Sequence, residues 1–186
     1  MDKKLLVWSL IVAAALFTVT IVLGIFTPLD SFWGMGQGLD DFLEPLQTAS
    51  PVLLLLFIFL NNAAKALGVV VLGILLGLPG VLFVTVNGFV IGAVVSAVES
   101  AKGLKYIVAS LIPHGVIEIP MLLLATALSF MVGWESFKWL SHRESRVESQ
   151  LLASVNLYLK VVLPGLAVAA IIEAFVTPWV INLVGG

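Results

Sequence analysis

The run LLVWSLIVAAALFTVTIVLGIF, residues 5–26, decides the fold class of this chain. It has no charged side chain, and it reaches the roughly 20 residues that a helix rising 1.5 Å per residue needs to cross the hydrocarbon core of a membrane. The preceding Met1-Asp2-Lys3-Lys4 resembles the start of a signal peptide. However, the run is longer than the apolar part of a signal peptide, and no small-x-small cleavage site closes it. We therefore predict a retained first transmembrane helix.

The composition of the rest of the chain points the same way. Of the 186 residues, 61% are hydrophobic and 11% are charged, and the mean hydropathy is +1.17. Soluble domains are roughly half apolar and a quarter charged, so a soluble enzyme or a disordered scaffold is excluded. A net charge of -2 without a dense basic run argues against nucleic acid as a partner. The absence of cysteine excludes disulfides and thiolate chemistry.

The same length criterion predicts further spans at about residues 49–78, 81–98, 104–133 and 151–184. The predicted fold class is all-α, a polytopic transmembrane helical bundle of about five spans in a single integral membrane domain, residues 1–186. Three of these stretches are longer than one span needs and carry polar residues, Pro or Gly in the middle. They are either kinked continuous helices or pairs of re-entrant half-helices, with break points expected at residues 113–115 and 164–165.

The distribution of basic residues predicts the orientation. With five spans, the N-terminal side holds Lys3, Lys4, Lys138, Arg143 and Arg146, against Lys102 and Lys105 on the other side. The positive-inside rule then predicts a multi-pass protein of the cell membrane with a cytoplasmic N-terminus. Between spans, residues 134–150 form a polar connection with interfacial aromatic residues, and residues 39–46 are predicted to form an amphipathic interfacial helix.

Polar residues within the spans are the candidates for function, because an ionisable group at the bilayer centre costs about 2.5–3.5 kcal/mol on insertion scales. Asn61 and Lys65 share a helix face at i,i+4 spacing, and so do His114 and Glu118. We predict a central polar cluster, or an ion-binding site, with Lys65 as a counter-ion. Its candidate members are Asn61, Asn62, Lys65, Asn87, His114, Glu118 and Glu173.

Simpler interpretations of the same residues stay open. Lys65 and Lys160 can extend to the interface from a helix end, and the asparagines can serve only to hydrogen-bond helices together. A histidine with carboxylates also suits a divalent cation, but the cluster holds one histidine where a zincin-like helix needs two. Whether a metal binds is left open, and neither a cofactor nor catalysis is predicted.

Small residues at four-residue spacing predict close helix packing. These pairs are Gly73 with Gly77 and Gly88 with Gly92. Pro79-Gly80 is expected to form a tight turn, so that the second and third spans become an antiparallel hairpin with their glycine faces close together. Asn87-Gly88 is read as a helical residue followed by a close-contact glycine.

Four of these motifs, in this order and approximate spacing, resemble the stage II sporulation protein M family. They are Asn61-Asn62; Asn87-Gly88 with Gly92; His114-Gly115 with Glu118; and Ile172-Glu173-Ala174 with Thr177-Pro178. The resemblance implies a small integral membrane protein of about five spans. Founding members of the family belong to an envelope-remodelling complex of endospore-forming bacteria, where they associate with cell-wall hydrolases. The family brings no established reaction, so the motif positions carry over as a shared polar core.

Two functions follow as hypotheses. The first is a non-enzymatic assembly component, whose partners are membrane lipids, further copies of the chain and other membrane or envelope proteins. The alternative is a small ion- or proton-coupled transporter or channel subunit that uses the polar cluster as its pathway, because broken helices with polar residues at mid-membrane are typical of transporters. An intramembrane hydrolase using His114 and Glu118 is a third, weaker interpretation.

Overall fold

The computed structural model describes residues 1–27 and 50–185, apart from the side chains of residues 100–102, 114, 184 and 185. All regular structure in these ranges is helical, which confirms the all-α prediction. The elements are α1 (Lys3–Ile25), α3 (Pro51–Val71), η2 (Leu72–Ile74), α4 (Leu78–Lys102), α5 (Leu104–Leu140), α6 (Val147–Leu157), η3 (Tyr158–Val162), α7 (Leu163–Ile171), η4 (Ile172–Val176) and α8 (Thr177–Gly185). The interfacial helix expected at residues 39–46 lies outside the described residues.

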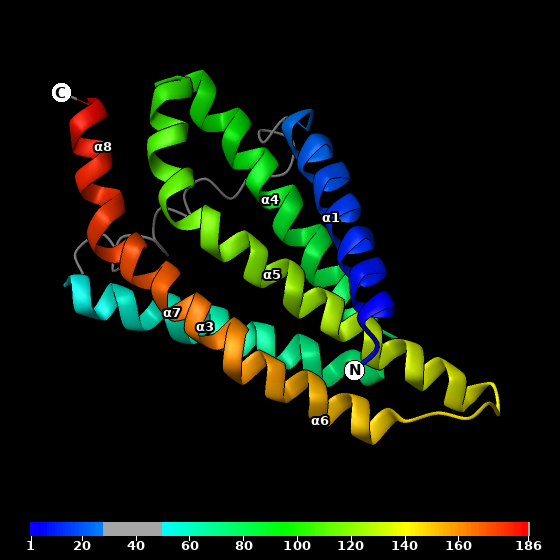
Figure 1. Cartoon of the computed structure of the whole chain (residues 1–186). Helices are drawn as coiled ribbons and strands as arrows, with labels where there is room; N and C mark the ends of the chain where they lie inside the picture. Colours follow the sequence, from blue (N-terminus) through cyan, green and yellow to red (C-terminus); the bar gives the residue numbers. More distant parts are fainter. Residues whose placement is uncertain (28–49, 186) are drawn as a thin grey trace.

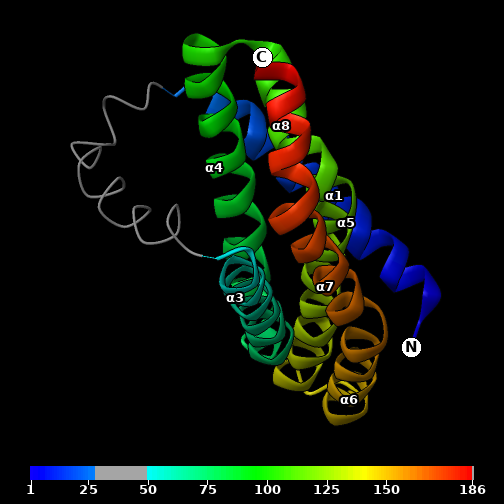
Figure 2. The ribbon, with the colours of Figure 1, turned by 90° about the vertical axis from the view of Figure 1, so that its left-hand side faces the viewer.

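Five helical segments in the described part of the chain are long and apolar enough to cross a membrane. They are Lys3–Ile25, Pro51–Ile74, Leu78–Glu99, Gly115–Leu140 and Val147–Leu183. Successive segments alternate in direction, so the N-terminus and the turn between α5 and α6 lie at one end, and α8 lies at the other end with the α4–α5 turn (Figure 1). α5 crosses the middle of the bundle, and Figure 2 shows α4 and α8 gathered near its N-terminal end. Gly115–Leu140 is the most buried of the five spans.

The fourth apolar stretch forms one continuous helix. α5 continues through Pro113 and Pro120 for 37 residues, about 55 Å at 1.5 Å per residue. The helix bends instead: its first turns lie beside α4, and the remainder crosses the bundle at a different angle (Figure 1). Pro113 explains a bend, because it lacks an N–H and its ring crowds the carbonyl four residues earlier. The kinked continuous helix is therefore correct, and the re-entrant alternative is wrong for this stretch.

The fifth apolar stretch is also continuous, and it accommodates its prolines with two π-helical segments. In η3 the N–H of Leu163 donates to the carbonyl of Tyr158, and in η4 the N–H of Thr177 donates to Ile172. Each segment ends two residues before a proline, Pro164 or Pro178. The wider π turn relieves the clash between a proline ring and the carbonyl four residues earlier. The break point predicted at residues 164–165 thus follows a π turn, and the chain does not reverse there.

The glycines of the third span pack against the first span. A Cβ on Gly88 would overlap Thr20 and Phe17, and a Cβ on Gly92 would overlap the backbone carbonyl of Ile21. Gly24 of α1 makes the reciprocal close approach to α4. α1 and α4 therefore form the most extensive helix pair of the bundle, whereas α3 and α4 make few contacts. The predicted hairpin with facing glycines is wrong, because α1 packs against Gly88 and Gly92, and α5 packs against Gly73.

The connection between α3 and α4 also differs from the prediction. Pro79 and Gly80 lie in the first turn of α4, where proline is favoured because its missing N–H needs no partner. The reversal occurs just before them, at Leu76 and Gly77, both with positive φ (57° and 76°). Gly73 packs against Ser129 of α5, and a Cβ on Gly133 would overlap Gly77.

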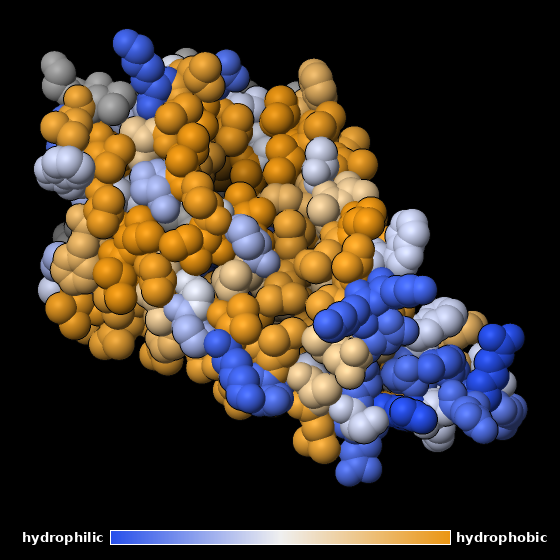
Figure 3. Space-filling view, in the orientation of Figure 1, coloured by the Kyte–Doolittle hydropathy of each residue, from blue (hydrophilic) through white to orange (hydrophobic). Residues whose placement is uncertain are grey.

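Helices extend beyond the apolar runs at the polar end of the bundle. Residues 134–150, predicted as a polar connection, instead supply the last turns of α5, a short turn and the start of α6. The length criterion measures the lipid-facing part of a helix, so it misses turns that continue into the interface. In Figure 3 the hydrophilic surface is concentrated at this end, and most of the remaining visible surface is hydrophobic.

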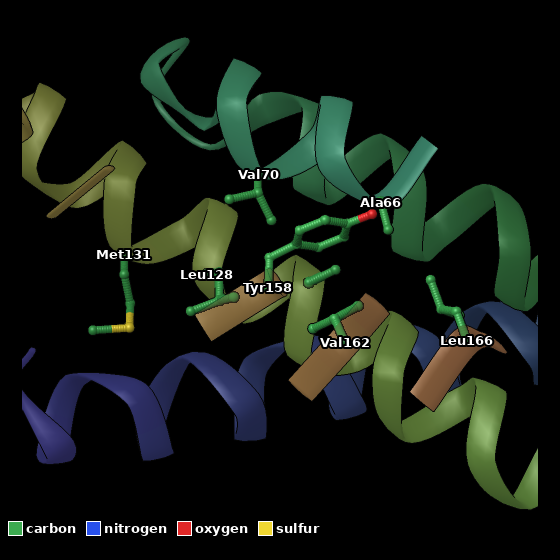
Figure 4. Packing of buried hydrophobic residues seen from close by; sticks show 8 residues of the cluster. Ala66, Val70, Leu128, Met131, Tyr158, Val162 and Leu166 are labelled. Atoms are coloured by element: carbon green, nitrogen blue, oxygen red, sulfur yellow. The ribbon is translucent and has the colours of Figure 1, made fainter. Parts of the chain in front are cut away.

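The apolar core lies where α3, α5 and the fifth span meet. Its buried members are Ala66, Val70, Ala125, Leu128, Met131, Tyr158, Val162 and Leu166, most of which Figure 4 labels. A second cluster around Phe17, Val84 and Leu122 joins α1, α4 and α5. α5 contributes to both clusters and so links the two sides of the bundle.

Candidate functional site: a polar contact between α3 and α5

Asn62 and Glu118 join two spans that are far apart in sequence. The amide Nδ2 of Asn62 donates to Oε1 of Glu118 over 3.0 Å. Asn62 lies in the middle of α3, and Glu118 lies one turn after the bend of α5. Both side chains are partly buried. A carboxylate in this position needs donors, because an unpaired polar group inside the membrane costs several kcal/mol.

The other two candidate asparagines, Asn61 and Asn87, donate hydrogen bonds within their own helices. Asn61 Nδ2 donates to Oδ1 of Asn62 over 3.3 Å, so the pair forms a short chain that ends on Glu118. Asn87 Nδ2 donates to the carbonyl of Phe83 in its own helix over 2.7 Å. This bond follows the i to i−4 pattern and satisfies the amide within α4.

Two small cavities adjoin this contact, and both include Asn87, Glu118 and Leu122. One has a volume of about 30 Å³ and is also lined by Asn62, Lys65, Ala66, Phe83 and Leu166. The other has about 160 Å³ and is also lined by Ile91, Leu111, Gly115 and Ile119. The structure therefore gathers four of the seven predicted residues, Asn62, Lys65, Asn87 and Glu118, around the same cavities.

The basic candidates are placed differently. Lys65 lines the smaller cavity from an exposed position, and it forms no ion pair with a described residue. Lys160 is exposed on η3. The backbone of His114 lies in α5 one turn before Glu118, and its side chain is outside the described part.

Glu173 belongs to a separate polar contact. Its Oε2 accepts a hydrogen bond from Oγ1 of Thr177 in the same helix over 3.0 Å, at the end of η4. Thr177 is buried, and its hydroxyl also lies 3.4 Å from the carbonyl of Ile172. Glu173 lines neither cavity beside Glu118. The described contact of Glu173 therefore joins η4 to α8, and its membership of the cluster at Glu118 stays a prediction.

Tyr158 is a polar contact that the sequence argument missed. Its side chain is 2% exposed, and its hydroxyl donates to the carbonyl of Ala63 over 2.8 Å. Ala63 follows Asn62, so α3 is held on one side by Glu118 of α5 and on the other by Tyr158 of η3. A tyrosine in an apolar run before Pro164-Gly165 was the available signal, since a buried tyrosine hydroxyl usually finds a partner.

A metal centre would need several donor side chains close together. Among the described side chains, which do not include that of His114, no three His, Cys, Asp or Glu residues lie close enough to hold an ion. Glu118 and the asparagine amides offer oxygen ligands, but a divalent cation needs about four to eight. The chemistry that this arrangement supports is hydrogen bonding between helices.

A bundle of five apolar spans crossed by such contacts defines a polytopic integral membrane protein. The family model described as Stage II sporulation protein M matches residues 13–178, which include every motif named above. The chain therefore belongs to the stage II sporulation protein M family. That family is not known as a family of enzymes. No curated protein and no solved structure matches the chain.

Proposed function

We propose that this protein is a non-enzymatic assembly component of the cell membrane, in which the Asn62–Glu118 contact fixes α3 on α5. The hydrogen bond between Nδ2 and Oε1 is the observation that carries the proposal. Asn61, Asn62 and Glu118 hydrogen-bond to one another, and Asn87 bonds to the backbone of its own helix, as in a structural contact. Partner proteins would then recognise the outer surface of a fixed bundle, and other membrane or envelope proteins are the expected partners.

The experiment compares Glu118→Gln with Glu118→Leu in proteoliposomes and in detergent. Glutamine keeps an acceptor oxygen for Asn62 but cannot ionise, whereas leucine removes the acceptor. A structural role predicts that Glu118→Gln keeps the thermal stability and the cross-linked assemblies of the unaltered protein, and that Glu118→Leu loses both. Loss of both in Glu118→Gln would contradict the proposal.

A small cation or proton transporter is the second candidate. The two cavities that meet at Glu118 and Asn87 favour it, because a titratable group beside small cavities in the membrane is a feature of ion pathways. This candidate predicts proton or cation flux into liposomes that Glu118→Gln abolishes. If the unaltered protein shows no flux above empty liposomes, the second candidate fails.

The same proposal includes a cytoplasmic N-terminus. The N-terminus and the α5–α6 turn share one end of the bundle, and that end carries Lys3, Lys4, Lys138, Arg143 and Arg146. Because the chain has no cysteine, single cysteines at Ser141 and Lys105 can be labelled without background. A membrane-impermeant maleimide added to intact cells should label Lys105→Cys and leave Ser141→Cys unlabelled. The opposite pattern would reverse the orientation.

The proposal also includes self-association of the chain. The close-packing faces of Gly88 and Gly92 are buried against α1, and Gly73 is buried against α5. A homo-oligomer must therefore use another surface. Chemical cross-linking in native membranes would detect the homo-oligomer. A protein that stays monomeric at every density in the membrane would contradict self-association.

A further inference from the structure

We propose that the polar end of the bundle binds one phosphatidylethanolamine molecule, with its headgroup between α1, α5 and α6 and an acyl chain between α1 and α5. Two neighbouring cavities of opposite character carry this inference. We call them the headgroup cavity and the acyl groove. They share Leu5 and Trp134, so they form one continuous surface from polar to apolar.

The headgroup cavity has a volume of about 400 Å³. Its charged lining consists of Asp2, Glu135, Lys138 and Arg146, and its uncharged polar lining includes Ser149 and Gln150. Met1 also lines the cavity, and its α-ammonium adds a third positive group. Because acidic and basic groups lie side by side in this lining, it complements a zwitterion, which carries both charges.

The acidic groups of the headgroup cavity are held in place before any ligand arrives. Glu135 is 9% exposed, pairs with Lys138 through Oε1, and accepts the backbone N–H of Arg146 through Oε2 over 2.8 Å. Asp2 caps α1 by accepting the N–H groups of Lys4 and Leu5 through Oδ1. A carboxylate offers about four acceptor positions, so both groups keep capacity for a donor.

The acyl groove has a volume of about 460 Å³ and a lining that is almost wholly apolar. The residues that bound it include Leu5 and Val12 of α1, Leu76 of the α3–α4 connection, and Trp134 and Phe137 of α5. Trp134 and Phe137 stack with ring centroids 5.7 Å apart and form a rigid wall next to the polar end. An aromatic pair at this level is typical of the membrane interface.

One wall of the acyl groove depends on a strained backbone. Leu76 lines it with a φ of 57°, in the left-handed region that a leucine rarely adopts. The turn stays in this conformation because Gly77 N–H bonds to the carbonyl of Gly73 over 2.9 Å, and Gly133 leaves room for it. Strain of this kind often accompanies ligand clamps.

The chemistry selects among phospholipids. The guanidinium of Arg146 and the ammonium of Lys138 would donate to the phosphodiester, and the carboxylates of Asp2 and Glu135 would accept N–H bonds from the ethanolamine ammonium. Phosphatidylcholine has the same charges but no N–H donor. Phosphatidylglycerol has no ammonium group for the carboxylates of Asp2 and Glu135 to bind.

Native mass spectrometry of the delipidated full chain, with equal amounts of the three lipids, tests the inference. We expect phosphatidylethanolamine to be retained about tenfold over phosphatidylcholine, the ratio that one or two charge-assisted hydrogen bonds support. Equal retention, or a preference for phosphatidylglycerol, would overturn it.

Matched variants locate the site. Arg146→Gln should reduce the retention of phosphatidylethanolamine about tenfold, because the phosphodiester loses a donor, whereas Arg143→Gln, in the same turn but outside the cavity lining, should leave it unchanged. Val12→Trp should fill the acyl groove and lower retention, and Val19→Trp, exposed elsewhere on α1, is its control. If Arg146→Gln does not fold, the comparison of Val12→Trp with Val19→Trp tests the proposal instead. Equal effects within a pair would place the lipid elsewhere and contradict the proposal.

Discussion

The α1–α4 contact and the α3–α5 contact hold their helices together in two different ways. Both must hold helices together in lipid, where burial of apolar side chains gives no advantage over contact with acyl chains. α1 and α4 meet through Gly24, Gly88 and Gly92, which bring backbone against backbone. α3 and α5 meet through the hydrogen bond between Asn62 and Glu118.

The difference lies in what each contact tolerates. The glycine contact fails when any atom is added, because a Cβ has no space. The polar contact fails when a partner is removed, because the remaining group keeps its unmet hydrogen-bonding need. Substitutions that enlarge the first contact and substitutions that remove a partner from the second therefore test the comparison separately.

The largest effect is expected for Gly92→Ala. Its Cβ would overlap the carbonyl of Ile21, so α1 and α4 must separate, and we expect a loss of about 3 kcal/mol or more in the free energy of unfolding. Gly68→Ala is the matched control, since a Cβ there meets nothing within 4 Å and alanine raises helix propensity. Unfolding in mixed detergent micelles measures both. A Gly92→Ala protein as stable as Gly68→Ala would show that α1 and α4 do not pack as described.

Glu118→Leu should have the next largest effect. It leaves the amide of Asn62 without its acceptor on α5, and we expect a loss of about 1–3 kcal/mol by the same unfolding measurement. Val116→Leu, on an exposed position of the same helix, is the control. A Glu118→Leu protein of unchanged stability would mean that the polar contact does not hold α3.

Tyr158→Phe should cost about 1 kcal/mol. The ring remains in the core, and only the hydrogen bond to the carbonyl of Ala63 is lost. Hydrogen exchange of α3 amides, alongside unfolding, should show faster exchange around Ala63. Unchanged exchange would indicate that the hydroxyl contributes nothing to holding α3.

The smallest effect, and one of opposite sign, is expected for Ser129→Ala. Ser129 is fully buried against Gly73 and Gly80, and its Oγ has no partner among the described residues. Removing an unsatisfied hydroxyl should leave stability unchanged or raise it by up to about 1 kcal/mol. Clear destabilisation in the unfolding assay would reveal a hydrogen bond at this position.

The sequence predicted the all-α class, the five spans and the close-contact role of Gly88, because each depends on local properties. Apolar length determines the span, and a glycine in an apolar helix allows close approach. The sequence could not identify which helix packs against Gly88. Gly88 and Gly92 were expected to face α3, but pairing is decided by the shapes of all five spans, and α1 fits them.

The candidate site was predicted in part for a similar reason. Asn61, Asn62 and Glu118 were all among the candidates, but spacing within one helix could not indicate that Asn62 would meet Glu118 across the bundle. Glu173 was another candidate, and its carboxylate accepts a hydrogen bond from the hydroxyl of Thr177 at the end of η4. The partner of Tyr158, the carbonyl of Ala63, lies in another span, which a local sequence pattern does not identify.

A double-mutant cycle between Asn62 and Glu118 tests the central claim most directly. The free energies of unfolding of Asn62→Leu, Glu118→Leu and the double variant would be measured in the same micelles. A direct hydrogen bond predicts a coupling energy of about 0.6–2 kcal/mol, so that the second substitution costs less once the first is present. Strictly additive losses would show that the two side chains act independently, and would contradict this account.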